Sequence, residues 1–442
     1  MQKIRAALHN LGCKVNAYET EVMMQQLRDA GYEIVPFQEE AEVYIINTCT
    51  VTNIADRKSR QMLHKAKKRN PDAIVVAVGC YAQAAGEEAM KETGVDLVIG
   101  NNRKKDIVSI LEEYSKEDNV TDNFIDINHT QEYEEMSLTE ATDHTRAYIK
   151  IQDGCNQFCS YCIIPFARGR VRSRKIENIV EEAEKLAKIG YQEVVLTGIH
   201  ISSYGIDFKE EKKTLLDVIL AIHEVRGIKR IRLGSLEPRI ITEEFAKTIS
   251  KLEKVCPHFH LSLQSGCDAT LKRMNRQYTT SDFSNICFIL RKYFKNPAFT
   301  TDVIVGFPGE TEEEFLQTMN FLKEICFAEM HVFKYSMRKG TRAANMPMQV
   351  PDQIKAERSE RCLALEGQME QAYKTEWFDR EVEVLFEEQI TIDGKKYFIG
   401  HTKEYLKVAV ETNEDLTNKI ERVIVRRELN KQIVLAELRN IY

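Results

Sequence analysis

The chain has 442 residues, of which 43% are hydrophobic and 29% are charged, and its formal net charge is −6. This is an ordinary globular composition with length for about two to four domains. No apolar stretch reaches the roughly 18 residues of a membrane helix, and the first residues show no secretory segment. We therefore exclude a membrane protein or a secreted disulfide scaffold, and expect a cytoplasmic protein with reduced cysteines.

Residues 1–114 alternate short apolar runs with amphipathic helical patterns. The apolar runs are residues 4–8, 43–46, 74–78 and 97–100, and the helical patterns cover residues 18–30, 53–69, 86–93 and a last stretch ending at 111. Strand–helix alternation of this kind predicts an α/β domain with a doubly wound, mostly parallel sheet.

This first domain holds three cysteines, and each follows the end of a predicted strand. They are Cys13, Cys49 and Cys80, called the N-terminal trio below. The carboxyl ends of parallel strands meet at one edge of the sheet, so these distant residues can converge there. Three soft thiolates without a fourth suit an iron–sulfur cluster with one open iron. The alternative is three buried cysteines that act as small hydrophobic residues.

Residues 115–144 are polar and acidic and show no clear period, which predicts a linker or flexible strap. This segment carries nine acidic residues and one lysine, so the remainder of the chain has a positive balance of +2. Two basic runs, at residues 57–69 and 168–175, suggest a basic rim for a polyanionic substrate. The alternative for such runs is an ordinary solvated face.

From residue 145 to about 340 the alternation resumes with six β/α units. Predicted strands cover residues 147–152, 193–196, 230–233, 258–263, 299–305 and 330–335. Eight units of a complete β/α barrel take about 250 residues, so six units in this length predict a partial, open barrel. Its active centre is expected at the carboxyl ends of the strands. We assign residues 145–373 to this domain.

The loop after the first of these strands contains the densest chemical signal in the chain. Its three cysteines, the loop trio, have the spacing C-x-x-x-C-x-x-C: Cys155, Cys159 and Cys162. Three thiolates in one loop again suit an iron–sulfur cluster with an open iron that can bind a small molecule. A zinc knuckle that lacks its fourth ligand, or a chance cluster, is the alternative.

Polar and glycine-containing segments follow the other strands of the partial barrel. Because they share one edge with the Cys155 loop, we predict cofactor contacts for Gly198, Glu237 and Gln264. A glycine turn that simply leads into a helix is the alternative. His200 lies among them and is given no role. Cys256, Cys267, Cys287, Cys326 and Cys362 show no ligand spacing and are predicted to be packing residues.

Residues 351–378 form a helical pattern, and five short strand patterns follow it. Residues 374–442 therefore predict a small all-β, OB-like barrel, a frequent nucleic-acid binder. With 12 basic and 14 acidic residues this domain is not basic overall, so RNA binding there would depend on a local patch and aromatic residues.

The Cys155 loop, with Tyr161 before its last cysteine, resembles the signature of the radical S-adenosylmethionine (SAM) family. The whole chain, from end to end, is similar to the methylthiotransferase branch of that family. The matching segments are Gly12–Asn16, Asn47–Cys49, Val78–Cys80, Leu263–Gly266 and Gly306–Thr311. The resemblance implies an N-terminal methylthiotransferase domain, a radical SAM domain and a C-terminal TRAM domain.

The resemblance also implies cofactors and roles. Each cysteine trio would hold a 4Fe–4S cluster, SAM would bind at the loop trio with Tyr161 near its adenine, and the N-terminal trio would deliver sulfur. A 5′-deoxyadenosyl radical would remove hydrogen from C2 of a modified adenine, and a second SAM would donate the methyl group. No side chain is assigned an acid–base role, because the C2–H bond has no acidic proton. A low-potential electron donor such as flavodoxin or ferredoxin is implied.

The residues after the first cysteine favour one substrate. Gly12-Cys13-Lys14-Val15-Asn16 looks like the subgroup that acts on N6-threonylcarbamoyladenosine beside the tRNA anticodon. That loop is single-stranded, so its bases can enter a pocket without melting a helix. The alternatives are isopentenyladenosine tRNA, a ribosomal protein, or a non-catalytic iron–sulfur protein that binds RNA or senses redox state.

Overall fold

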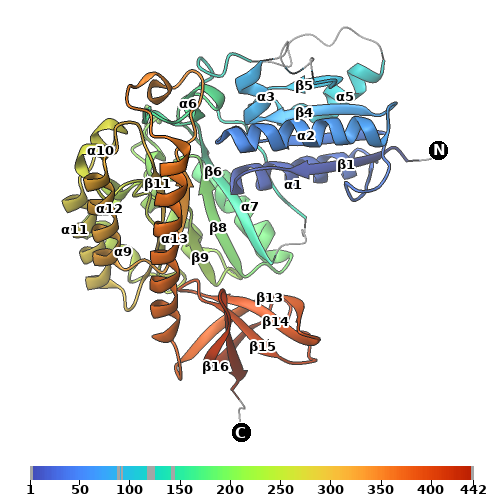
Figure 1. The fold of residues 1–442 in the computed structure, drawn as a ribbon. Helices are drawn as coiled ribbons and strands as arrows, with labels where there is room; N and C mark the ends of the chain where they lie inside the picture. Colours follow the sequence, from blue (N-terminus) through green and yellow to red (C-terminus); the bar gives the residue numbers. More distant parts are fainter. Residues whose placement is uncertain (1–2, 87–89, 91–92, 117–124, 141–144, 440–442) are drawn as a thin grey trace.

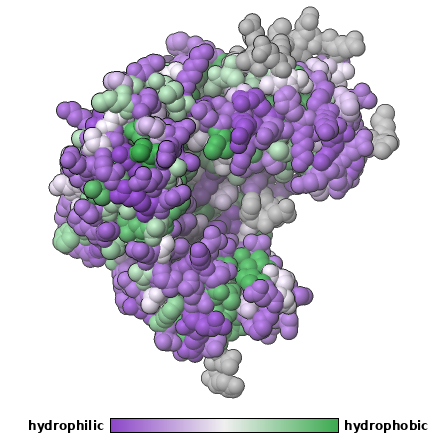
Figure 2. Space-filling model, viewed as in Figure 1, coloured by the Kyte–Doolittle hydropathy of each residue, from purple (hydrophilic) through white to green (hydrophobic). Residues whose placement is uncertain are grey.

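The computed structural model describes residues 3–86, 90, 93–116, 125–140 and 145–439. They form two parallel-sheet units followed by a small closed barrel (Figure 1). Hydrophilic residues cover most of the face seen in Figure 2, which is hollowed between the first unit and the C-terminal barrel. None of the helices in the described ranges is long and apolar enough to cross a membrane.

The first unit is a five-stranded parallel sheet in the order β2-β1-β3-β4-β5. Its elements are β1 (Arg5–Asn10), α1 (Lys14–Asp29), β2 (Glu33–Ile34), β3 (Val43–Thr48), α2 (Asn53–Arg69), β4 (Ile74–Gly79), α3 (Cys80–Ala85), β5 (Leu97–Ile99), the 3₁₀ turn η1 (Lys104–Asp106) and α5 (Ile107–Ser115). Every residue of β3 is buried, which explains its unbroken apolar run. The doubly wound sheet is confirmed, although β2 was not predicted.

The strand order of this sheet also fixes where a ligand can bind. From β1 the chain passes to β2 on one side and then to β3 on the other, so the topological switch point lies between β1 and β3. Ligands of open α/β sheets bind outside the carboxyl ends of the strands at this point. The helix predicted over residues 86–93 lies largely outside the described residues.

The second unit contains six parallel strands, as predicted. Its strands are β6 (Arg146–Asp153), β8 (Glu193–Gly198), β9 (Arg230–Leu233), β10 (His258–His260), β11 (Ala298–Val305) and β12 (Glu329–Lys334), with β7 (Arg172–Ser173) antiparallel to β6. Parallel bridges from Ile231 to Val255 and from Leu236 to Leu261 join β9 to the β10 side, so the strands follow one another in a partial barrel.

Helices cover the outside of this partial barrel (Figure 1). They are α7 (Ile176–Lys188), α8 (Leu215–Glu224), α9 (Glu243–Ile249), α10 (Asp268–Arg273), α11 (Thr280–Tyr293) and α12 (Glu312–Ile325). The short helix α6 (Ile164–Ala167) instead packs against α3 of the first unit, and the 3₁₀ turns are η2 (Ile201–Ser203), η3 (Pro238–Ile240) and η4 (Arg342–Asn345). Local sequence determines where several of these helices begin. At the start of α12, for example, Thr311 and Glu314 form a capping box.

A long helix, α13 (Asp352–Thr375), leads to a closed five-stranded barrel, again as predicted. The strands are β13 (Glu381–Ile392), β14 (Lys395–Thr402), β15 (Lys407–Glu411), β16 (Ile420–Asn430) and β17 (Ile433–Leu438), in the order β13-β14-β15-β17-β16. This barrel docks on the amino-terminal ends of the central strands: Arg146 pairs with Glu387 at 3.3 Å, and Arg230 donates to the His401 carbonyl at 2.9 Å.

The described residues 125–140 of the acidic segment contain no helix or strand but pack against both units. Ile127, Met136 and Leu138 are buried, and the Tyr133 hydroxyl donates to the Lys150 carbonyl at 2.8 Å. The packed part of the segment thus acts as a strap between the first sheet and β6.

A buried carboxylate on α7 fixes this strap to the first unit. Glu182 accepts from the Leu138 N–H at 2.7 Å and from the Tyr18 hydroxyl of α1 at 3.1 Å, and it pairs with Arg174. Burial raises the pKa of Glu182, which Arg174 partly offsets. Three segments far apart in sequence therefore meet at one carboxylate.

We expect Glu182→Ala to lower the free energy of unfolding by about 3 kcal/mol, because buried donors lose their acceptor. The matched control is Glu181→Ala on the same helix, whose exposed pair with Lys185 predicts a change within about 0.5 kcal/mol. Urea unfolding followed by circular dichroism measures both, and equal midpoints would contradict this role of Glu182.

Candidate functional site

The three cysteines of the N-terminal trio lie at the carboxyl ends of three neighbouring strands. Cys13 caps α1 just after β1, Cys49 follows β3, and Cys80 opens α3 directly after β4. Cys13 and Cys49 thus flank the β1/β3 switch point. Cys13 is exposed, whereas Cys49 and Cys80 are buried.

The sulfur atoms of this trio are close enough to influence one another. A Cβ on Gly12, next to Cys13, would lie only 2.9 Å from the Cys49 sulfur. The pKa of Cys49 is raised to about 11, mainly by burial and with smaller contributions in the same direction from Cys80 and Cys13. Buried thiols of this kind ionise when a bound metal replaces their protons.

The loop trio follows β6, and several backbone contacts hold the loop in place. The Cys155 N–H donates to the Gly169 carbonyl at 3.0 Å, and the Cys162 N–H donates to the Cys159 carbonyl at 3.0 Å. Burial raises the pKa of Cys155 to about 11, and Cys159 adds to this effect. Burial and Cys159 also raise the pKa of Cys162. The loop therefore gathers three interacting thiols at the strand edge.

A positively charged side chain donates a hydrogen bond to one sulfur of each trio. Arg168 Nε lies 3.1 Å from the Cys80 sulfur, and Arg276 Nη1 lies 3.3 Å from the Cys159 sulfur. Donors to cluster sulfurs are the outer contacts that orient and tune such sites. Neither arginine was predicted from the sequence, because no spacing rule links them to these cysteines.

Two contacts place the trios at a common edge. Asn101 Nδ2 lies 3.9 Å from the Cys80 sulfur and donates to the Ala167 carbonyl of α6 at 2.7 Å, and α6 follows Cys162 directly. On the other side, Arg338 of the second unit donates to Thr50 at 2.6 Å and pairs with Asp56 at 2.7 Å, beside Cys49.

The donor sets fit iron–sulfur clusters. Each site offers three thiols, the soft ligands that such clusters take, together with N–H donors to sulfur. Among the described residues, no three His, Cys, Asp or Glu side chains are placed to hold a single metal ion. A cluster binds each thiolate at a different iron, so it does not need sulfurs that converge on one ion.

The predicted cofactor contacts lie at the same edge, and their role remains a prediction. Tyr161 is partly buried against Phe307, with ring centroids 6.4 Å apart. Glu237 is buried, accepts from Arg239 at 2.7 Å and acts electrostatically on Cys155. Gln264 has φ +70°. Gly198 packs tightly, since a Cβ there would lie 2.9 Å from the Gln152 carbonyl.

His200, which the sequence left without a role, lies beside these residues. Burial, then Arg276 and Arg239, lower its pKa to about 4, so the ring is neutral near pH 7. Nδ1 contacts the Ser203 hydroxyl at 2.7 Å, while the buried Nε2 has no hydrogen-bond partner among the described residues. The sequence predicted a polar strand end at residues 196–200, but nothing in it indicated that the His200 imidazole is neutral.

Within residues 168–175, the prediction of an exposed basic rim holds for Arg170 and Lys175, which are exposed, and is wrong for the other three basic residues. Arg168, Arg172 and Arg174 are almost completely buried in ion pairs, because acidic partners from distant segments surround them. The other basic run forms an exposed stripe on α2, and it begins beside Cys49. Its exposed members are Arg57, Lys58, Lys65 and Lys68. The prediction for the remaining cysteines is wrong for Cys326, which is exposed.

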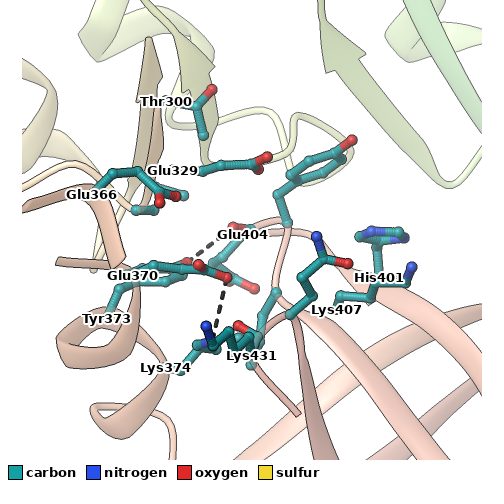
Figure 3. A pocket seen from close by; sticks show the side chains of 15 residues that line it. Thr300, Glu329, Glu366, Glu370, Tyr373, Lys374, His401, Glu404, Lys407 and Lys431 are labelled. Atoms are coloured by element: carbon teal, nitrogen blue, oxygen red, sulfur yellow. Dashed lines mark hydrogen bonds and ion pairs between the residues drawn. The ribbon is translucent and has the colours of Figure 1, made fainter. Parts of the chain in front are cut away.

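A cavity of about 450 Å³ lies between the second unit and the C-terminal barrel (Figure 3). It is lined by the amino-terminal ends of β11 and β12, by α13 and by the C-terminal barrel, including Glu329, Glu366 and Glu370. Burial and the two neighbouring glutamates raise the pKa of Glu366. Because the cysteines lie at the opposite ends of the strands, this cavity is not part of the candidate site.

Comparison with known proteins gives consistent results for both units. Residues 149–322 match the radical SAM superfamily, and residues 5–100 match the uncharacterized protein family UPF0004. A relative named threonylcarbamoyladenosine tRNA methylthiotransferase MtaB, from Bacillus subtilis, is 44% identical over 94% of this chain and 92% of its own. The protein of the same name from Aquifex aeolicus is 42% identical over 80% and 86%.

More distant relatives carry another name or share only the fold. A tRNA-2-methylthio-N(6)-dimethylallyladenosine synthase from Thermoanaerobacter pseudethanolicus is 36% identical over 94% of this chain and 89% of its own. The solved structure of the radical SAM methyltransferase TsrM from Kitasatospora setae has a TM-score of 0.55 and 15% identity, covering 75% of each chain. It supports the fold alone.

The loop trio depends on a glycine, which gives a test of its cluster. Gly154 has φ +70°, and a Cβ there would lie 1.8 Å from the Arg170 carbonyl, so Gly154→Ala must displace the adjacent Cys155. After anaerobic reconstitution we expect about half of the wild-type iron, because only the N-terminal trio still binds a cluster. Gly190→Ala is the control, with φ +106° but no atom nearer than 3.9 Å. Full iron in Gly154→Ala would contradict the assignment.

Proposed function

The chain belongs to the methylthiotransferase branch of the radical SAM family, and we propose that it converts N6-threonylcarbamoyladenosine beside the tRNA anticodon to its 2-methylthio derivative. The observation that carries this proposal is the pair of three-thiol sites at one edge, in a chain 44% identical to MtaB over 94% of its length. The reaction replaces the hydrogen on C2 of the adenine by a methylthio group.

We assign the loop trio as the ligands of the cluster that binds SAM. When bound, this cofactor pair supplies a radical that can break the C2–H bond, which no side-chain base can do. Tyr161, Gly198, Glu237 and Gln264 would contact SAM, and Arg276 would keep the Cys159 thiolate in place. An electron from a low-potential donor such as flavodoxin or ferredoxin would start the reaction in the cytoplasm.

We assign the N-terminal trio as the ligands of a second 4Fe–4S cluster, the source of the sulfur. A second SAM would provide the methyl group. One adenine carbon must first lose hydrogen and then receive sulfur, so both trios must be reachable from one bound base. The contacts through Asn101 and Arg338, which join the two cysteine sites, support this arrangement.

The substrate assignment agrees with a second chemical feature, the α2 stripe. Exposed cations extend from the side of Cys49, where Ile54 is 57% exposed, along the helix. Lys and Arg on such a surface suit RNA phosphates, and apolar side chains at its end suit unstacked bases. The C-terminal barrel docks at the amino-terminal ends of the central strands, whereas the cysteines lie at the carboxyl ends. A strand of this length spans about 20–25 Å, so the barrel would contact a more distant part of the tRNA.

We expect Arg57→Glu with Lys58→Glu to weaken tRNA binding and to reduce the slope of log K against log salt by about one per lost phosphate contact. The control pair is Lys247→Glu on α9 with Lys251→Glu in the turn after that helix; both lysines are exposed, and this variant should bind like the wild type. Filter binding at several salt concentrations measures both, and an unchanged slope in the α2 variant would exclude the stripe as an RNA contact.

The reaction itself is tested with tRNA that carries N6-threonylcarbamoyladenosine, incubated anaerobically with reconstituted enzyme, reductant and SAM. Mass spectrometry of the nucleosides should detect the methylthio group, and Cys13→Ala or Cys159→Ala should reduce it at least 100-fold, because each removes a cluster ligand. Cys326→Ala, which changes an exposed cysteine outside both trios, is the matched control and should keep activity.

If SAM is cleaved but no methylthio product forms, the radical chemistry is supported and this substrate is refuted. The same assay with isopentenyladenosine tRNA and with ribosomal protein then distinguishes the alternatives. Cluster binding with no SAM cleavage at all would instead favour a non-catalytic iron–sulfur protein.

A further inference from the structure

A network of buried ion pairs lies directly behind Cys80. Its carboxylates are Glu19 of α1 and Asp153 of β6, and its cations are Lys104, Lys150, Arg168 and Arg172. The side chains are at most 3% exposed. Four cations face two carboxylates, so the network holds an excess of two positive charges away from water.

Excess buried charge of this size is costly unless another group neutralises it. Among the described residues, Glu19 and Asp153 are the only carboxylates that form ion pairs with these cations within 4 Å. Nε and Nη2 of Arg172 have no hydrogen-bond partner in the described part of the chain. The network therefore lacks negative charge, and the nearest chemical group that can supply it is a cluster held by thiolates.

Arg168 is the member of this network that reaches the N-terminal trio. Its Nη atoms donate to Glu19 at 2.8 and 3.0 Å, to Asn16 at 2.6 Å and to Asp153 at 3.2 Å. These bonds fix the guanidinium so that the remaining donor, Nε, points at the Cys80 sulfur at 3.1 Å. All five N–H groups of the arginine are thus engaged.

We propose that Arg168, with the positive charge behind it, raises the reduction potential of the cluster on the N-terminal trio. This rests on the proposed function, which places a cluster there. A three-thiolate 4Fe–4S cluster is anionic and becomes more negative on reduction, so a nearby cation and an N–H···S bond stabilise the reduced form. Arg168 is then a positioning residue that also sets the redox state of the sulfur-delivering site.

The second arginine provides a control of the same chemistry. Arg276 makes the equivalent N–H···S bond to Cys159 in the other trio, and it is partly buried beside Tyr278. If the effect is local, removal of Arg168 changes the potential of the N-terminal cluster, whereas removal of Arg276 does not.

The experiment isolates one cluster by replacing Cys155, Cys159 and Cys162 with alanine in the full chain. Arg168→Gln, Arg168→Lys and Arg276→Gln are added separately to this background. The readouts are iron content, thermal unfolding and the midpoint potential from an EPR-monitored titration with dithionite. We expect Arg168→Gln to shift the midpoint to a clearly more negative value, Arg168→Lys to shift it less, and Arg276→Gln to leave it unchanged.

A midpoint in Arg168→Gln that equals the background, with normal iron content, would overturn the inference. Equal shifts in Arg168→Gln and Arg276→Gln would also overturn it, because the effect would then not be local. If Arg168→Gln does not fold, the midpoint potential of Arg168→Lys is compared with that of the background instead, since lysine retains the charge and loses the Nε donor. If the background binds no iron, the proposed N-terminal cluster fails, which is a different result.

Discussion

The pairing of Glu19 with Arg168 is the contact on which the site depends. Glu19 belongs to the first sheet unit, whereas Arg168 follows the loop trio in the second, and both side chains are completely buried. Lys150 of β6 pairs with the same carboxylate at 2.7 Å. Breaking such a pair leaves an uncompensated buried charge, so the two units are held in one relative position. This position brings two cysteine sites to a shared edge.

Topology explains why the cysteines meet and why much of the site was predictable. Parallel strands end at one edge, so Cys13, Cys49 and Cys80 converge although 36 and 31 positions separate them in sequence. Apolar runs and helical periods identified the strands of both sheets, and the Cys155 loop required only its own spacing. The strand order of the first sheet could not be predicted, because β2, which lies outside β1, is only two residues long and has no recognisable pattern.

The contacts around the sulfurs could not be predicted, because they join residues far apart in sequence. Residues 168–175 read as an exposed basic run, yet Arg168 and Arg174 are buried against Glu19 and Glu182, which lie on other helices. Arg276 stands 117 positions from Cys159, and nothing in the local sequence indicates their contact. Charge patterns report composition, whereas burial depends on which element packs above each side chain.

The central claim is that both clusters lie at one edge, within reach of a single adenine. Arg168, which contacts the Cys80 sulfur, lies six positions after Cys162 in the sequence, so the extended chain alone limits the distance between Cys162 and Arg168 to about 20 Å. The direct test is the EPR spectrum of the fully reduced wild-type protein. The account predicts broadened, fast-relaxing signals from magnetic coupling between the clusters. A spectrum equal to the sum of two single-cluster variants, with all cysteines of one trio replaced in each, would contradict it.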